Sequence, residues 1–186
     1  MEGFTMQLDG MDIVRKAQVY AMAAHAAVGQ RRKYTNEPYI VHPAEVAKMV
    51  ADVPGSTPDM VAAAWLHDVI EDTGCTFYDV HMGFGIDIAD LVAWVTDKSN
   101  PEDGNRARRK QIDHDFIAQA PAEAHTIKAC DIISNVRSIA EHDLNFAKVY
   151  LPEKRSQLAV LTRAHPDILA KAWAELEKAE KHLQEN

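Results

Sequence analysis

The sequence has little of what stabilises small secreted domains or carries a chain across a membrane. Its 186 residues include only two cysteines, Cys75 and Cys130, without a CxxC pair, so neither a disulfide scaffold nor a zinc knuckle is expected. No apolar run approaches the roughly 20 residues that span a bilayer. Residues 1–12 have neither the basic start nor the apolar core of a signal peptide. We therefore expect a reduced, cytoplasmic protein with no membrane partner.

Positive charge is also scarce. The chain has 20 Lys and Arg against 28 Asp and Glu, a net charge of −8, which argues against a general nucleic-acid-binding surface. No alternating run of β-branched residues, no internal repeat and no low-complexity tract stands out. A chain of this length suits one compact domain, which we expect to span residues 1–186.

Helix-forming segments separated by proline and glycine make up most of the chain. Thr57-Pro58 is typical of an N-cap followed by proline in the first turn, and Thr76 with Asp79 resembles a capping box. The predicted fold class is all-α. The last helix has an apolar face that packs either internally or against a second subunit, so a homo-oligomer stays open. The expected helices cover residues 11–28, 44–53, 58–74, 76–83, 86–97, 105–119, 122–141, 144–163 and 167–183.

The segment AAAWLHDVIEDT, residues 62–73, begins as an apolar helix and then places four ionisable side chains, His67, Asp68, Glu71 and Asp72, within six positions. Side chains four apart share a helix face, so we expect one compact polar patch. Imidazole nitrogens and carboxylate oxygens suit a divalent transition metal. Glu71 and Asp72, one turn on, are placed to orient or deprotonate a water. The alternative is a solvated acidic helix end, which the helix dipole disfavours.

A second polar cluster lies on the helix expected over residues 119–142. Helical periodicity puts five polar side chains in one narrow stripe: Lys128, Asp131, Asn135, Ser138 and His142. Because apolar residues flank this stripe on both sides, it favours a lined cavity over a solvated surface, although solvated stripes are common. Asp131 would then supply a metal oxygen, and Asn135 and Ser138 would hydrogen-bond a ligand.

Two short basic segments stand out in this acidic chain. The loop GQRRKYTNEPYIVHP, residues 29–43, includes Arg32 and Lys33, which suit phosphates, while an arginine plane also stacks on a base. The segment 97–110 carries further cations, among them Lys98, Arg106 and Arg109. A solvated loop is the alternative for each segment. Together they would draw an anionic small molecule towards a site.

The ordered set YIVHP, LHDVIEDT and KACDIISNVR resembles the HD-domain metal phosphohydrolases. The resemblance implies a helical bundle with the metal site in a central cleft. It also implies that one metal is bound by His42, His67, Asp68 and Asp131.

The chain more closely resembles the (p)ppGpp hydrolase domain of the RelA/SpoT family. The family patterns HxGQxRK…PYIxHP, HDxxED and KxxDxxxNxR are matched by GQRRKYTNEPYIVHP, HDVIED and KACDIISNVR. The resemblance spans roughly residues 15–165, which leaves no room for a synthetase or regulatory domain. It therefore implies a small, free-standing alarmone hydrolase with a small-molecule nucleotide substrate.

This resemblance implies roles for the remaining residues. The metal would be Mn²⁺, and Glu71 and Asp72 would position and activate the attacking water. The reaction would release the 3′-pyrophosphate and leave GDP or GTP. The nucleotide would be bound by Arg32, Lys33, Asn135 and Ser138. The segment 97–110 does not align with the family pattern, and from their charge alone we expect Lys98, Arg106 and Arg109 to discriminate among substrates.

One departure from the family pattern concerns the substrate. Where family members often have Arg, Leu and His, this chain has Ile132, Ile133 and Ser134. Other HD enzymes therefore stay open: an NADPH phosphatase, an adenine alarmone hydrolase or a nucleotidase. A catalytically inactive HD domain that senses a nucleotide is a further alternative, although every expected catalytic group is present.

Overall fold

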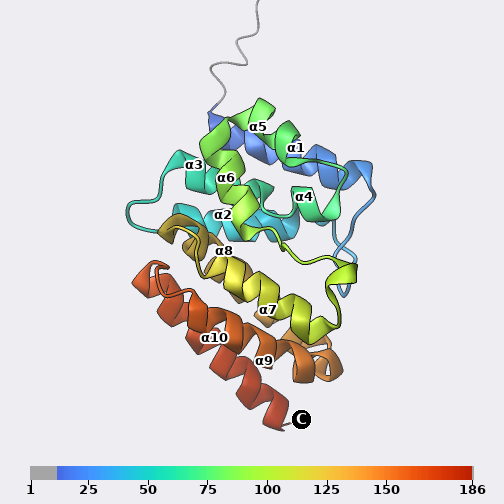
Figure 1. Ribbon diagram of the computed structural model, residues 1–186. Helices are drawn as coiled ribbons and strands as arrows, with labels where there is room; N and C mark the ends of the chain where they lie inside the picture. The colour runs from blue at the N-terminus through green and yellow to red at the C-terminus, as the bar shows by residue number, and fades with distance from the viewer. Residues whose placement is uncertain (1–11, 186) are drawn as a thin grey trace, which may run out of the picture.

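The computed structural model describes residues 12–185, and every regular element in this range is a helix (Figure 1). The elements in chain order are α1 (Ile13–Ala27), α2 (Val41–Ala51), α3 (Pro58–Leu66), α4 (Val69–Asp72), α5 (Phe77–Phe84), α6 (Ile86–Val95), the 3₁₀ turn η2 (Pro101–Asp103), α7 (Arg106–Ile117), α8 (Ala122–His142), α9 (Leu144–Val160) and α10 (Pro166–Glu185). The all-α fold class is confirmed. One domain over residues 1–186 stays a prediction.

The helix starts follow from local capping. The Thr57 side chain accepts the N–H of Met60, with Pro58 in the first turn of α3. Thr76 and Asp79 form the predicted capping box at the start of α5. Asn105 caps α7 through the N–H of Arg108. These signals are local, which is why most predicted boundaries lie within a few residues of the observed ones.

The prediction of one continuous helix over residues 58–74 is wrong. Helix α3 ends at Leu66 and α4 begins at Val69, with Asp68 at φ −102° and ψ −4° between them. The His67 Nδ1 atom lies 2.7 Å from the carbonyl oxygen of Ala64, with which an unbroken helix would pair the N–H of Asp68. This side-chain contact competes with the helical bond. His67 and Asp68 therefore occupy a junction and do not share a helix face with Glu71 and Asp72.

Helix α8 passes through the middle of the molecule, between the amino-terminal helices and the pair α9 and α10 (Figure 1). It contacts α2, α3, α6, α9 and α10, and most of its residues are buried. Polar side chains on such a helix need partners inside the protein, because burial without partners is costly. The polar stripe predicted on this segment therefore faces an internal site.

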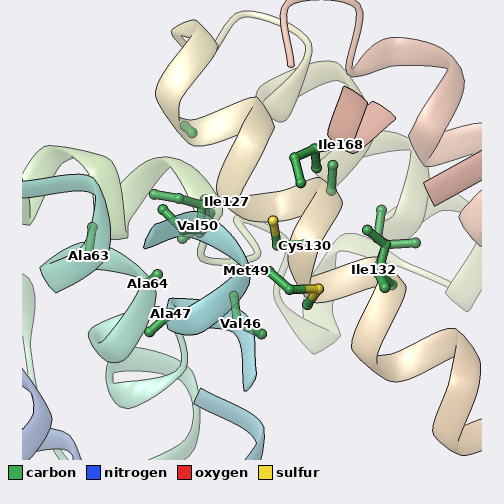
Figure 2. Packing of buried hydrophobic residues seen from close by; sticks show 14 of the residues in the cluster. Val46, Ala47, Met49, Val50, Ala63, Ala64, Ile127, Cys130, Ile132 and Ile168 are labelled. Carbon is green, nitrogen blue, oxygen red and sulfur yellow. The ribbon is translucent and has the colours of Figure 1, made fainter. Parts of the chain in front are cut away.

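Apolar side chains from α2, α3, α8 and α10 meet in the core (Figure 2). Val50 from α2, Ala64 from α3 and Ile127 from α8 are fully buried. Burying a valine or isoleucine side chain of this kind contributes roughly 1.5–3 kcal/mol relative to exposure. This packing fixes the spacing of α2, the α3–α4 junction and α8, which carry His42, His67 and Asp131.

The three residues that depart from the family pattern, at positions 132–134, lie in two different environments. Ile132 and Ile133 are fully buried in the apolar core. Ser134 instead contacts His42, as described below. The two isoleucines therefore act on packing and do not face a ligand.

The apolar face of α10 packs internally against α8 and α9, with Leu176 fully buried. A homo-oligomer stays a prediction. Cys75 and Cys130 are both free thiols, as the sequence predicts. No helix among residues 12–185 has the length and apolar character needed to cross a membrane.

Candidate active site

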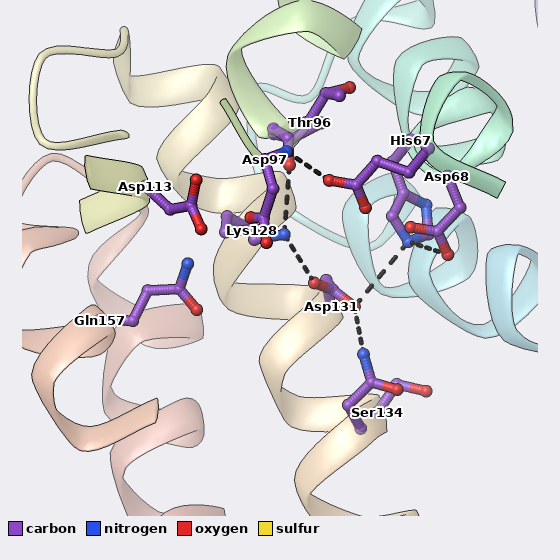
Figure 3. A network of polar contacts seen from close by, with 12 residues as sticks. His67, Asp68, Thr96, Asp97, Asp113, Lys128, Asp131, Ser134 and Gln157 are labelled. Carbon is purple, nitrogen blue, oxygen red and sulfur yellow. Dashed lines mark hydrogen bonds and ion pairs between the residues drawn. The ribbon is translucent and has the colours of Figure 1, made fainter. Parts of the chain in front are cut away.

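Four side chains from three parts of the chain converge on one point. His42 Nε2 lies 3.2 Å from His67 Nε2 and 3.2 Å from Asp131 Oδ1, while Asp68 Oδ2 lies 3.1 Å from His67 Nε2 and 3.5 Å from His42 Nε2. All four side chains are buried, and Figure 3 shows His67, Asp68 and Asp131 facing one another. One ligand atom from each of His42, His67 and Asp131 lies within 4.8 Å of the other two, so these three residues could hold a metal ion, and Asp68 lies directly beside both histidines. We call these four residues the metal cluster.

Hydrogen bonds behind the two histidines direct their lone pairs to the centre of the cluster. His67 Nδ1 faces the Ala64 carbonyl oxygen, so that nitrogen carries the proton. Ser134 donates its hydroxyl proton to Glu45, at 2.7 Å, and its oxygen accepts from His42 Nδ1, at 2.9 Å. Both Nε2 lone pairs therefore face two carboxylates and each other. This donor set fits a divalent cation.

The charges around the cluster favour a cation at its centre. Burial disfavours the imidazolium of His67, but Asp68 and Asp131 outweigh this effect and raise the pKa of His67 to about 9. Burial also disfavours the Asp131 carboxylate, but Lys128, 3.2 Å from Asp131 Oδ2, holds the pKa of this aspartate well below its usual range. Asp131 is therefore ionised and available as a ligand.

An open cavity of about 270 Å³ adjoins the metal cluster. Its walls come from the α3–α4 junction and α4, from the stripe on α8, and from α9. We call it the metal cavity; it is lined by Tyr39, Asp68, Glu71, Asp72, Asp97, Lys128, Asp131, Asn135, Ile139, Tyr150 and Lys154.

A second open cavity, of about 470 Å³, lies next to the metal cavity, and we call it the basic cavity. The two cavities share Tyr39, Asp72, Asn135 and Ile139. The remaining lining residues of the basic cavity are Gln30, Arg31, Arg32, Lys33, Tyr34, Ser138 and Phe146. The structure thus brings Arg32, Lys33, Asn135 and Ser138 together around one space.

Glu71 lies at the mouth of the metal cavity. It accepts a hydrogen bond from the backbone N–H of Asp97, which fixes its direction. The Glu71 side chain still reaches solvent. Partial loss of hydration nevertheless raises the pKa of its carboxyl to about 6, although the charge of Lys128 opposes this effect. A carboxylate with this pKa suits proton transfer near neutral pH.

Asp72 lies between the two cavities and is held by a short chain of side chains. Gln30 Nε2 donates to Asp72 Oδ2 at 2.9 Å, and Gln30 Oε1 lies 2.6 Å from Nδ1 of the buried His25. The loop that carries Arg32 and Lys33 therefore also orients a carboxylate beside the metal cluster.

Sequence reasoning missed Gln30 and Asp97, which hold Asp72 and Glu71, and four further residues of the site. Tyr39 donates its hydroxyl to Asp68 Oδ2 at 2.7 Å, and its position three residues before His42 was the available signal. Ser134 orients His42 and carried no signal as a ligand-orienting residue. Tyr150 and Lys154 stand four apart on α9, so they share a helix face, but no motif marks them.

The three cations that the sequence singles out in the second basic segment line neither cavity. Arg106 forms a two-pronged ion pair with Glu153, at 2.6 and 2.8 Å. Lys98 Nζ lies 5.2 Å from the ring centroid of Phe116, and Arg109 is on α7. None of these three basic residues lines the metal cavity or the basic cavity.

The family profile of the HD domain matches residues 17–151. The chain belongs to the HD-domain family. The resemblance to the HD-domain phosphohydrolases drawn from the three ordered motifs is thereby confirmed.

Relatives with known names share most of this HD domain. The chain is 33% identical over 150 residues to guanosine-3′,5′-bis(diphosphate) 3′-pyrophosphohydrolase MESH1 of Drosophila melanogaster, covering 80% of each protein. It is 33% identical over 150 residues to the bifunctional (p)ppGpp synthase/hydrolase SpoT of Escherichia coli, of which it covers 20%. A solved structure described as a metazoan orthologue of SpoT that hydrolyses ppGpp matches with a TM-score of 0.79 at 25% identity, covering 89% of this chain and 94% of the other.

Proposed function

We propose that this HD-domain protein hydrolyses (p)ppGpp, releasing pyrophosphate from the 3′ position and leaving GDP or GTP. One observation carries the proposal: a buried cluster of two histidines and two aspartates opens onto a cavity that adjoins a second, basic cavity. The likeness to MESH1 over 80% of both chains supports it.

The metal cluster would hold one divalent metal through His42, His67, Asp68 and Asp131. A metal bound there supplies Lewis-acid activation of water and of the phosphoryl group. We propose that this metal is Mn²⁺, which the RelA/SpoT resemblance implies. We also propose that the protein is cytoplasmic.

The water-handling groups are Glu71 and Asp72. Glu71, fixed by the N–H of Asp97, accepts a proton from the attacking water. Asp72, fixed by Gln30, orients that water. The water oxygen adds to the phosphorus attached to O3′, the bond between that phosphorus and O3′ breaks, and O3′ takes up a proton.

The basic cavity would bind the nucleotide. Arg32, whose guanidinium lies 5.9 Å from the ring centroid of Tyr39, would stack on the guanine, and Lys33 would contact a phosphate. Asn135 and Ser138, which both lie on α8, would form hydrogen bonds with the nucleotide. Lys98, Arg106 and Arg109 would act at longer range, through the field that draws an anion to the site.

The test is to strip the protein of metal and incubate it, with and without Mn²⁺, with ppGpp, pppGpp, ppApp and NADPH. We expect Mn²⁺-dependent conversion of ppGpp to GDP and pyrophosphate, faster than turnover of ppApp or NADPH. Turnover of NADPH or ppApp alone would overturn the guanine specificity. Metal binding without turnover of any substrate would favour the sensor.

A further inference from the structure

Three lysines lie around the metal cavity, and two of them are paired with carboxylates. Lys128 Nζ lies 3.2 Å from Asp131 Oδ2, and Lys110 Nζ lies 2.6 Å from Asp97 Oδ2. The third, Lys154 on α9, forms no ion pair with any carboxylate in residues 12–185. Among the cations that line the metal cavity, Lys128 is therefore already neutralised and Lys154 is not.

The contacts of Lys154 are neutral. Its Nζ donates to Gln157 Oε1 at 2.8 Å and lies 5.1 Å from the ring centroid of Tyr150. An ammonium has three N–H donors, and this amide is the one hydrogen-bond partner it has within the described part of the chain. The buried Gln157 thus holds the ammonium at the cavity wall without a direct carboxylate contact.

A poorly solvated cation that contacts no carboxylate directly is destabilising for the protein. Burial, reinforced by the charge of Lys128, lowers the pKa of Lys154 to about 8, although the carboxylates of Asp131 and Asp97 oppose this effect. An anion entering the metal cavity would relieve this cost. The chemistry that fits is a phosphate oxygen, which offers a full negative charge to an ammonium.

The division of the two cavities indicates which phosphate this is. Lys154 lines the metal cavity only, so groups bound in the basic cavity are recognised by other residues. If the nucleoside occupies the basic cavity and the phosphorus next to O3′ lies at the metal cluster, the second phosphate of the 3′-diphosphate must occupy the rest of the metal cavity. Lys154 lines that space.

We propose that Lys154 binds the terminal phosphate of the 3′-diphosphate and makes the enzyme prefer a 3′-diphosphate to a 3′-monophosphate. The proposal rests on the proposed function, of which it names a specificity-determining residue. It assigns to α9 a recognition role that none of the three sequence motifs contains.

The first test compares Lys154→Gln and Lys154→Arg with the matched control Lys148→Gln, an exposed lysine on the same helix. The substrates are ppGpp and the analogue with a single 3′-phosphate. We expect Lys154→Gln to raise KM for ppGpp about 10- to 100-fold and to remove a similar part of the preference for ppGpp. Lys154→Arg should retain most of it. An unchanged preference, or an equal loss with both substrates, overturns the proposal.

The second test measures binding of inorganic pyrophosphate to the metal-loaded proteins by calorimetry, which needs no turnover. We expect about tenfold weaker binding to Lys154→Gln and unchanged binding to Lys148→Gln. If the wild-type protein does not hydrolyse ppGpp yet shows this difference, the proposed function fails and the Lys154 site stands. If it hydrolyses ppGpp and the difference is absent, the Lys154 site fails and the function stands. Thermal melting of each variant checks that it is folded.

Discussion

The metal cavity and the basic cavity are built in different ways. Every metal-cluster side chain is buried and has a second partner behind it, such as Ala64 for His67 or Tyr39 for Asp68. In the basic cavity, Lys33 is 71% exposed and is held by an ion pair with Asp143, and Arg32 has a ring contact with Tyr39. Chemistry needs donor atoms held in place before substrate arrives, whereas recognition tolerates side chains that adjust. We therefore expect the reaction to take place in the metal cavity and the nucleoside to be selected in the basic cavity.

The largest effect should come from Asp68→Ala, which removes a ligand and leaves the hydroxyl of Tyr39 without its acceptor. We expect loss of bound metal and a fall in turnover of about a thousandfold or more. Metal content after dialysis and the initial rate on ppGpp are the measurements. Asp72→Asn, beside the cluster but outside it, should retain metal. Full metal occupancy in Asp68→Ala would remove the basis for the division between cavities.

Glu71→Gln should show that Glu71 acts on the attacking water and not on metal binding. Turnover should fall about 100- to 1,000-fold while metal content stays at the wild-type level. Because the raised pKa of Glu71 leaves it protonated in acid, wild-type activity should rise with pH as Glu71 ionises. That acidic limb should be missing from the pH–rate profile of the variant. An unchanged limb would show that another group accepts the proton.

Arg32→Ala tests the selecting side of the comparison. We expect KM for ppGpp to rise about 10- to 30-fold with kcat within about threefold, because the contact is the same in ground and transition states. Steady-state kinetics measures both constants. Arg15→Ala, an exposed arginine on α1, is the control and should match the wild type. A fall in kcat with unchanged KM would move Arg32 to the chemical step.

Gln30→Leu should give the smallest effect. It tests whether Gln30, which lines the basic cavity, acts on the reaction through Asp72 or on nucleotide binding. Gln30 lines the basic cavity, but its amide donates to Asp72. We therefore expect about a three- to tenfold fall in kcat with little change in KM. Because leucine has nearly the volume of glutamine, Gln30→Leu removes the hydrogen bond to Asp72 without leaving an empty space. If KM moves and kcat does not, Gln30 acts on the nucleotide and not on Asp72.

Much of the fold follows from local sequence signals. Thr57, Thr76 and Asn105 cap helices through neighbours three residues away at most, so their effects are legible in the sequence. The stripe on α8 was predicted by periodicity, and the structure places Lys128, Asp131 and Asn135 along one cavity. Spacing within a helix says nothing about segments far apart in the chain. The convergence of the four cluster residues was therefore implied only by the family resemblance of the ordered motifs.

The missed features depend on contacts that sequence patterns do not encode. The break after Leu66 arises from the contact between His67 and the Ala64 carbonyl, a competition that helix propensity does not reveal. The unpaired state of Lys154 depends on the partners that Lys110 and Lys128 find on other segments. The exclusion of Arg106 from both cavities likewise follows from its ion pair with Glu153 on α9.

The most direct test of the division between cavities is a double-mutant cycle on kcat/KM for ppGpp with Arg32→Ala, Glu71→Gln and the combined variant. Because the two residues lie in different cavities and share no direct contact, the account predicts that their losses multiply, within about twofold. A combined loss no larger than that of Glu71→Gln alone would contradict it, because the two residues would then act as one unit.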